Sequence, residues 1–309
     1  MSTAGKGRLV ALGAAVVGVA IALSGCASSD PLSTGESSAA AGQTLIVGSQ
    51  DYYSNEIIAE LYTLALENGG FKVEENFRIG QREVYLPQLE AGKVDVFPEY
   101  IGSLDQALNK SAPGGTADEV YADLTKSLPA GLRVLNMAKA SDQNSWTVTK
   151  AFAEKYHLTD IASLKNVTEP ITVGGNAELE TRPYGPTALK TKYGISIAGF
   201  KAVQDSAGPL TVKALVDNEI QLANIYTADP NIKSNNLVAL SDPDGLFFPD
   251  NVAPIVSKKV DAKAVEILNG VSGKLTASDL VSLNSESVNE KKSAETIAKA
   301  WLKDKGLIK

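Results

Sequence analysis

The stretch LEAGKVDVFPEYIGS, residues 89–103, carries the pattern that decides the fold. Leu89 ends an apolar helical segment, Gly92 supplies a turn, and the apolar positions that follow alternate as in a buried strand. The tyrosine at position 100 comes where that strand ends. The stretch therefore predicts a helix end, a turn and a strand that places Tyr100 at its carboxyl end.

The same order of residues recurs 126 positions later, in LVDNEIQLANIY at 215–226. The matched pairs are Leu89 with Leu215, Gly92 with Asn218, Val94 with Ile220, Val96 with Leu222, and Tyr100 with Tyr226. LIVGSQ at 45–50 and ITVGGN at 171–176 repeat at the same spacing. This predicts two α/β lobes built to one plan, each bringing a glycine turn and a tyrosine to the strand ends, where open α/β sheets bind ligands.

The first residues have the pattern of a secretory leader. Lys6 and Arg8 precede an apolar run at 10–23, which is shorter than the roughly 20 residues that a membrane span needs. The run ends in LSGC, which resembles the lipobox of bacterial lipoproteins and predicts lipidation of Cys26, the chain's single cysteine. The alternative is a lone buried cysteine. We expect a signal peptide at 1–25 and a flexible tether, rich in Ser, Ala and Gly, at 26–43.

Length and charge narrow the class of protein. A chain of 309 residues is long enough for two domains with separate cores. The formal net charge is −7, and removal of Lys6 and Arg8 with the leader leaves 27 basic against 36 acidic residues, or −9. This balance argues against nucleic acid as a partner. With one cysteine, no disulfide framework is possible within the chain.

Strand and helix patterns alternate along the chain, which predicts parallel α/β lobes. Two apolar stretches are expected to cross between the lobes, SDQNSWTV at 141–148 and FFPDNVAPIV at 247–256. These crossings divide the chain into lobe one at 44–143, lobe two at 144–246, and a return to lobe one at 247–309. Ile297 and Trp301 form an apolar pair on a helical tail that is expected to dock on lobe one. The fold class predicted is α/β, a type II periplasmic-binding-protein fold with two α/β lobes joined by two crossing strands.

Four stretches make the chain similar to a known family: GSQDYYSNEIIAELY from 48, REVYLPQLEAGKVDVFPEYIGS from 82, GPLTVKALVDNEIQLANIYTADP from 208, and DPDGLFFPDNVAPIV from 242. The chain resembles, over about 44–305, the substrate-binding proteins of ABC importers for quaternary amines such as glycine betaine, choline and carnitine. The resemblance implies capture of an osmoprotectant between two lobes that close by a hinge, and delivery to a permease and an ATPase. Together with the lipobox, it leads us to expect an extracytoplasmic monomer that is anchored to the membrane through Cys26 and uses no cofactor.

A quaternary ammonium group has no N–H to donate, so aromatic faces and negative dipoles must recognise it. Tyr100 and Tyr226 match the family's cage tyrosines, and the alternative for each is half-buried packing. Trp146 falls near the family's aromatic residue on the first crossing, with hinge packing as its alternative. Phe200 is the single aromatic residue in GFKAVQDSAG, 199–208, so the family's fourth cage residue has no assigned position.

Three further residues are expected at the other end of the ligand. Arg182 matches an arginine that grips the carboxylate of betaine in the family, and its alternative is a surface ion pair with Glu178 or Glu180. Gln50 stands where some relatives carry lysine, which favours ligands without a carboxylate, such as choline. Ser103, one turn past Tyr100, is expected to donate a hydrogen bond from its hydroxyl group.

The sequence argues against an enzyme. His157 is the single histidine and lies in the polar context KYHLTD, and no GxSxG, GxGxxG, P-loop or HExxH pattern occurs. We therefore expect no catalytic residues and no metal. Two alternatives stay open: a binding protein for another small polar solute, such as an amino acid or other compatible solute, and a lipid-anchored enzyme on the same bilobal fold.

Overall fold

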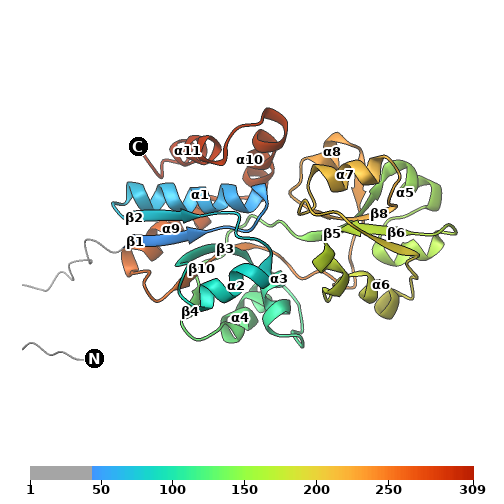
Figure 1. Cartoon of the computed structure of the whole chain (residues 1–309), viewed down its shortest axis with the longest axis horizontal. Coiled ribbons are helices and arrows are strands. Elements are labelled where there is room, and N and C mark those ends of the chain that lie inside the picture. Colours follow the sequence, from blue (N-terminus) through green and yellow to red (C-terminus); the bar gives the residue numbers. More distant parts are fainter. Residues whose placement is uncertain (1–43) are drawn as a thin grey trace, which may run out of the picture. The chain divides into compact units, whose positions relative to one another are not determined.

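The computed structural model describes residues 44–309. The expected signal peptide, the tether and Cys26 lie outside the described residues. The described chain forms two five-stranded sheets, with strand orders β2-β1-β3-β10-β4 and β7-β6-β8-β5-β9. We call the part built around the first sheet lobe one and the part built around the second sheet lobe two (Figure 1). The mixed α/β architecture with two sheets confirms the predicted fold class.

Lobe one takes its strands from both ends of the described chain. Its strands are β1 (Thr44–Gly48), β2 (Lys72–Asn76), β3 (Val96–Tyr100), β4 (Leu132–Val134) and β10 (Val252–Ser257). Its helices are α1 (Tyr53–Asn68), α2 (Arg82–Glu90), α3 (Ile101–Leu108), α4 (Ala117–Ser127), α9 (Ala262–Lys274), α10 (Ala277–Glu290) and α11 (Ala294–Asp304). The strands β1, β2 and β3 are parallel, whereas β10 runs antiparallel to both β3 and β4.

Lobe two is continuous in sequence. Its strands are β5 (Asn144–Thr149), β6 (Thr172–Gly175), β7 (Gly199–Ala202), β8 (Leu222–Tyr226) and β9 (Leu237–Ala239). Its helices are α5 (Lys150–Tyr156), α6 (Pro186–Tyr193), α7 (Pro209–Val216) and α8 (Asn231–Ser234), with 3₁₀ turns at Ile161–Asn166 and Ala177–Thr181. β5 is the antiparallel strand of this sheet, so each lobe adds one crossing strand to a parallel core.

The two crossings lie side by side. Ser141 and Asn251 form an antiparallel bridge, and the backbone N–H groups of Val252 and Asp142 donate to the carbonyls of Ala140 and Asp250 at 3.0 and 3.2 Å. These bonds join the two connections just where they pass between the lobes. The predicted pair of crossings is therefore a short two-stranded connection, as a hinge requires.

The 126-residue repeat extends to individual hydrogen bonds. After α2, the N–H of Gly92 donates to Leu89 at 3.0 Å, and after α7 the N–H of Asn218 donates to Leu215 at 3.1 Å. The N–H of Asp95 donates to Ile46 O at 2.7 Å, and that of Gln221 donates to Thr172 O at 3.0 Å. In return, the side chains of Asp95 and Gln221 accept from the N–H groups of Ile46 and Thr172. The two lobes thus place β3 and β8, with their terminal tyrosines, by the same contacts.

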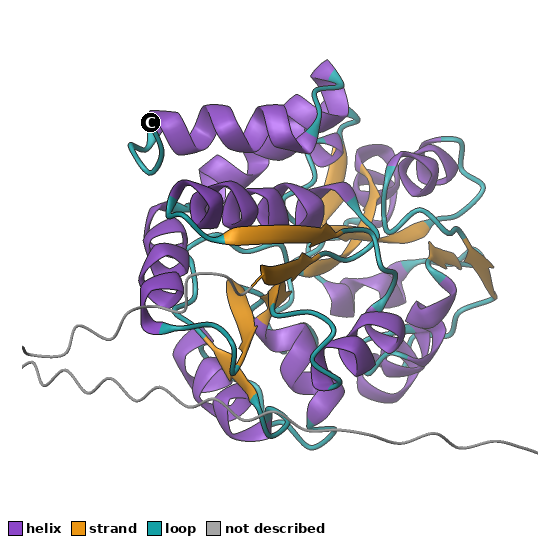
Figure 2. Cartoon of the chain, turned by 60° about the vertical axis from the view of Figure 1, so that its left-hand side comes forward, coloured by secondary structure: helices purple, strands orange, loops and turns teal. Residues whose placement is uncertain are grey.

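Helices cover the sheets on both faces, so the strands read as buried apolar runs (Figures 1 and 2). All five residues of β3 are buried. The tail docks on lobe one as expected, because Ile297 and Trp301 on α11 are 1% and 7% exposed and belong to the core that includes α1. Thr276 begins α10 with a capping box.

Two features of lobe one are set by the crossings. Helix α3 follows β3 without a spacer, and no local side chain caps it. Instead, Asp250 from the second crossing accepts from the N–H of Ser103 at 2.6 Å, and the carbonyl of Asn251 accepts from Ile101. A cap supplied from so far along the chain leaves no local signal. Strand β4 ends at Val134, since the residues that follow it lead into the first crossing.

The repeat predicts how one turn tolerates substitution. Gly92 and Asn218 are equivalent and both have left-handed backbones, with φ of 66° and 60°. A Cβ at Gly92 would meet no heavy atom within 4 Å, so backbone conformation alone decides the cost. We expect Gly92→Ala to lower the free energy of unfolding by about 1–2 kcal/mol. Gly92→Asn should cost clearly less, because asparagine adopts this conformation at the matching turn. Urea denaturation of both variants checks this, and equal losses would contradict it.

Candidate ligand-binding site

A pocket lies between the carboxyl ends of the parallel strands of the two sheets. Its lining comes from both lobes and from both crossings: Gln50, Tyr52, Gln81, Arg82, Tyr100, Ser103, Asp142, Asn144, Asn176, Glu178, Leu179, Arg182, Tyr184, Ala207, Asn224, Tyr226 and Asp250. Five of the residues predicted from sequence are brought together here, namely Tyr100, Tyr226, Arg182, Gln50 and Ser103. The position agrees with the rule for ligand sites in open α/β sheets.

Three tyrosine rings gather in this pocket. The Tyr52 ring lies 6.3 Å from that of Tyr100 and 5.1 Å from that of Tyr226, centroid to centroid, with interplanar angles of 28° and 32°. Tyr52 and Tyr100 come from lobe one and Tyr226 from lobe two, so the cluster spans the cleft. A fourth ring, Tyr184, also lines the pocket and packs on Phe247 at 5.4 Å.

A buried carboxylate stands next to these rings. Asp142, on the first crossing, is 3% exposed and accepts hydrogen bonds from Ser54 Oγ at 3.0 Å and from the N–H of Ala228 at 2.8 Å. Burial raises the pKa of Asp142 to about 7, against the lowering effect of these two bonds. The same carboxylate contributes to the raised pKa of Tyr52, Tyr100 and Tyr226, whose main cause is burial. A positive charge at this place would offset the cost of ionising Asp142.

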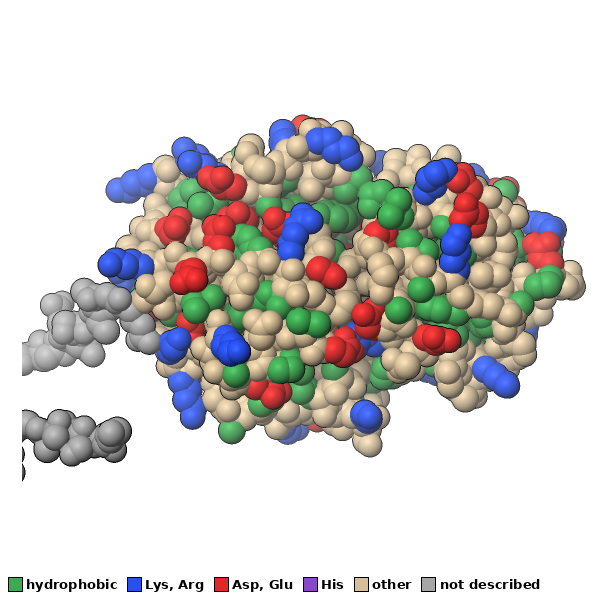
Figure 3. Space-filling view, viewed as in Figure 1, with side chains coloured by type: hydrophobic (Ala, Val, Ile, Leu, Met, Phe, Trp, Pro, Cys, Tyr) green, Lys and Arg blue, Asp and Glu red, His purple; other side chains and the backbone are tan. Residues whose placement is uncertain are grey.

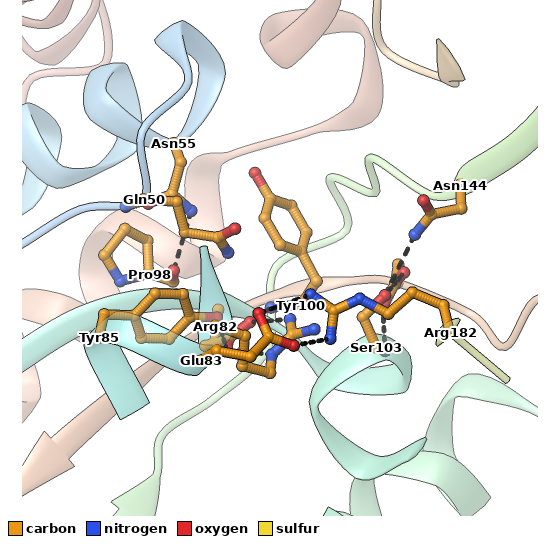
Figure 4. A network of polar contacts seen from close by, with 12 residues as sticks. Gln50, Asn55, Arg82, Glu83, Tyr85, Pro98, Tyr100, Ser103, Asn144 and Arg182 are labelled. Atoms are coloured by element: carbon orange, nitrogen blue, oxygen red, sulfur yellow. Dashed lines mark hydrogen bonds and ion pairs between the residues drawn. The ribbon is translucent and has the colours of Figure 1, made fainter. Parts of the chain in front are cut away.

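Tyr100 is held in place by an ion pair behind it. Glu99 accepts from Arg82 Nε at 3.1 Å and Nη2 at 3.0 Å, from the hydroxyl of Tyr85, and from the N–H of Tyr100 at 2.8 Å (Figure 4). Arg82 and Glu99 are 8% and 1% exposed. Burial alone would lower the pKa of Arg82, but the Glu99 carboxylate outweighs it and the pKa is raised. Arg82 therefore keeps its charge, and its contact with Glu99 fixes the strand end.

Ser103 is already engaged. Its hydroxyl donates to Asp250 at 2.6 Å and accepts from the side-chain amide of Asn144 at 3.2 Å, a contact between the lobes. Its hydrogen is therefore not available to a ligand while Asp250 is ionised. Burial raises the pKa of Asp250 to about 6, although both bonds from Ser103 lower it. Asp250 is the second buried carboxylate of the pocket.

Arg182 does not pair with Glu178 or Glu180. Its guanidinium lies against Glu83 of helix α2, with Nη1 at 2.7 Å from Oε1 and Nη2 at 3.1 Å from Oε2. The two residues come from different lobes, and Figure 4 shows the guanidinium reaching across to Glu83. The alternative of an ion pair with Glu178 or Glu180 thus named the wrong partner, although Arg182 does form an ion pair. The sequence could not show the true partner, since only the fold brings α2 opposite Arg182.

A second contact closes the rim. Ser206 and Ala207 both have left-handed backbones, with φ of 53° and 61°. This conformation turns Ser206 toward lobe one, where its hydroxyl donates to Asp51 at 2.9 Å and accepts from Gln81 at 3.1 Å. Consecutive non-glycine residues with left-handed backbones are uncommon, and here hydrogen bonds from Ser206 to both lobes hold them.

Trp146 is not in the pocket. Its side chain is 0% exposed in the core of lobe two, where its ring lies 6.2 Å from that of Phe247. Asn144 lines the pocket instead, two residues earlier on β5, because only the start of that strand reaches the cleft. Phe200 also packs against the core of lobe two. Gln50 does line the pocket, and its side-chain Nε2 is buried with no hydrogen-bond partner among the described residues.

Sequence reasoning missed several lining residues. Tyr52 directly follows the glycine turn after β1, and Tyr184 comes two residues after Arg182. Their closeness in sequence to residues already predicted at the site could have identified them. Asp142 and Asp250 are the acidic residues of the two crossings, SDQN and FPDN. Each acid is buried in the described structure, which a polar sequence context does not predict.

Within residues 44–309, no group of three or more His, Cys, Asp or Glu side chains is arranged to hold a metal ion. The helices in that part of the chain are too short or too polar to cross a bilayer. On the face drawn in Figure 3, acidic and basic side chains are interspersed without a broad basic patch.

Comparisons with known proteins agree on one family. A family model for OpuAC, the substrate binding domain of ABC-type glycine betaine transport systems, matches residues 43–304. The glycine betaine-binding protein YehZ of Escherichia coli (strain K12) is 24% identical over 280 residues, covering 85% of this chain and 91% of that protein. The ergothioneine transport permease/ergothioneine binding protein EgtU of Helicobacter pylori (strain G27) is 25% identical over 273 residues, covering 85% of this chain and 48% of that protein.

A solved structure described as a glycine betaine/carnitine/choline ABC transporter superposes with a TM-score of 0.69. It is 19% identical in sequence, and the match covers 85% of this chain and 99% of that one. At this identity, the likeness shows a shared fold.

The pocket carboxylates predict a pH dependence of stability. The pKa of Asp142 is raised by folding, so its favourable contribution is complete below its unfolded value near 4 and is lost as the pH rises through about 7. We therefore expect Asp142→Asn to gain stability over the wild type, without ligand, as the pH rises from 4 to 7, by a few kcal/mol at most. Chemical denaturation at several pH values measures this, with Asp118→Asn, an exposed carboxylate on α4, as the control. A wild-type-like profile for Asp142→Asn would contradict the assignment.

Proposed function

The chain belongs to the family of substrate-binding domains of ABC-type glycine betaine transport systems, and we propose that it captures a quaternary ammonium solute between its two lobes. The family consists of extracytoplasmic substrate-binding proteins of ABC importers, not of enzymes. The solute is of the glycine betaine, choline or carnitine type, and the closed form presents it to a membrane permease that works with an ATPase.

One observation carries this proposal: the rings of Tyr52, Tyr100 and Tyr226 meet beside the buried carboxylate of Asp142. A trimethylammonium group is recognised by desolvated aromatic faces, each contributing roughly 0.5–2 kcal/mol. Three such rings supply roughly 2–6 kcal/mol, less than the roughly 8 kcal/mol of a micromolar complex. The Asp142 carboxylate would supply part of the remaining binding free energy, because the attraction between opposite charges is stronger in a pocket that excludes water.

Closure is the second part of the proposal. Polar contacts between the lobes include Glu83 with Arg182, Gln81 with Ser206, and Ser103 with Asn144, and the rings of Tyr52 and Tyr226 also meet across the cleft. Polar contacts of this kind form and break at low net cost in water. A ligand that bridges Tyr100 and Tyr226 would favour the closed arrangement through its differential affinity for it. With lobe boundaries proposed at 144 and 247, the moving joint lies beside Asp142 and Asp250.

The membrane association rests on the first residues. We propose that residues 1–25 are removed as a signal peptide and that Cys26, lipidated, anchors a monomer through the tether at 26–43. The support is the charged and apolar leader followed by LSGC. The permease partner is supported by family membership and by EgtU, whose name joins a permease to a binding protein.

The tyrosine cluster is tested by removing its rings. We expect Tyr100→Ala and Tyr226→Ala each to weaken choline and glycine betaine binding by about tenfold or more, since each loses a cation–π face and its contact area. Tyr100→Phe should stay within about twofold of the wild type, because the Tyr100 hydroxyl has no hydrogen-bond partner among the described residues. Isothermal titration calorimetry measures the affinities, and thermal melts check that each variant folds. Unchanged affinity in both alanine variants would refute the cage.

A further inference from the structure

The contact between Arg182 and Glu83 has the geometry of a ligand contact. Two guanidinium nitrogens face two carboxylate oxygens, at 2.7 and 3.1 Å, which is the bidentate arrangement by which arginine recognises a carboxylate. The Arg182 side chain is 14% exposed and lines the pocket, whereas that of Glu83 is 56% exposed and lies at the rim. The protein therefore places one of its own carboxylates on an arginine that lines the pocket.

The charges around the pocket point the same way. Arg82 and Arg182 are the two lining cations, and each is paired with a carboxylate outside the lining, Glu99 and Glu83 respectively. Three lining carboxylates, Asp142, Asp250 and Glu178, form no ion pair within residues 44–309. The fixed cations are thus already neutralised, and the remaining charge of the lining is negative. Such a pocket suits a ligand with a positive charge and no carboxylate.

We propose that Glu83 is a specificity-determining residue, which occupies the carboxylate-binding edge of Arg182 and thereby selects quaternary ammonium alcohols over betaines. The inference rests on the proposed function and adds to it the class of solute that is preferred. A betaine must displace Glu83 from Arg182 before its own carboxylate can bind there. An alcohol such as choline leaves the pair intact, and the pair then bridges the two lobes over the bound cation.

Gln50 is consistent with this assignment. It lies in the same pocket as Arg182, and its Nε2 group is buried without a partner among the described residues. A neutral amide donor can bond a hydroxyl oxygen as well as a carboxylate, but it adds no charge that would repay the burial of an anion. The pocket therefore holds uncommitted neutral donors, including the Gln50 amide and the Tyr100 hydroxyl, whereas both of its arginines are committed.

The test compares choline with glycine betaine by calorimetry on the mature domain. The variants are Glu83→Gln, the double variant Glu83→Gln with Arg182→Met, and Glu180→Gln. Glu180 is an exposed carboxylate near Arg182 that makes no ion pair with it, so this variant controls for the loss of one negative charge. The readout is the ratio of the two dissociation constants, which a general effect on folding or on closure does not change.

We expect the wild type to prefer choline, and Glu83→Gln to shift the ratio toward glycine betaine by tenfold or more. The double variant should lose this shift, because Arg182 is then no longer available to the betaine carboxylate. A ratio within twofold of the wild type in Glu83→Gln, or an equal shift in Glu180→Gln, would overturn the role of Glu83 while leaving the proposed function intact. If the wild type binds neither choline nor glycine betaine, the proposed function itself fails, and the assignment of Glu83 fails with it.

Discussion

The buried carboxylate of Asp142 is the interaction on which the site depends. It lies on the first crossing, accepts from Ser54 on α1, and accepts from the N–H of Ala228 just after β8. These two hydrogen bonds connect the first crossing to both lobes. In each lobe the bonded element lies next to a pocket tyrosine, Tyr52 before α1 and Tyr226 at the end of β8. Because burial raises its pKa to about 7, the protein without ligand holds this charge at a cost. A bound cation would remove that cost, which couples recognition to the joint between the lobes.

The two lobes position their pocket tyrosines, Tyr100 and Tyr226, by the same local structure. In each, a left-handed turn after a helix leads into a buried strand, and the strand ends in a tyrosine at the cleft. The lobes then diverge in what supports that tyrosine. Tyr100 is fixed by Glu99 and Arg82, whereas Ile225 stands at the position equivalent to Glu99. The repeat therefore accounts for the placement of the rings, and lobe-specific substitutions account for the charges around them.

The fold followed closely from the sequence because its signals are local and repeated. Glycine turns and apolar strands each act within a few residues, and the 126-residue offset showed which segments correspond. Family membership and the α/β fold with two crossings are confirmed by the comparisons. What sequence did not show arises between distant segments: Asp250 capping α3, and Glu83 meeting Arg182 across 99 residues. We expected Trp146 at the ligand site, but Asn144, two residues earlier on β5, lines the pocket instead. Residues two apart on a strand share a face, so the Trp146 side chain points the same way but lies farther along the strand, in the core. The roles of Tyr100, Tyr226 and Arg182 in binding stay predictions.

We propose a cation site in which a buried carboxylate complements the ligand. It is tested most directly by counting protons during choline binding, using calorimetry at pH 6.5 in buffers that differ in ionisation enthalpy. With a pKa of about 7, Asp142 is mostly protonated at this pH before binding, and a cation beside it lowers that pKa. We expect net proton release by the wild type, and a smaller release by Asp142→Asn. Choline binding with no proton exchange, or with proton uptake, would contradict it.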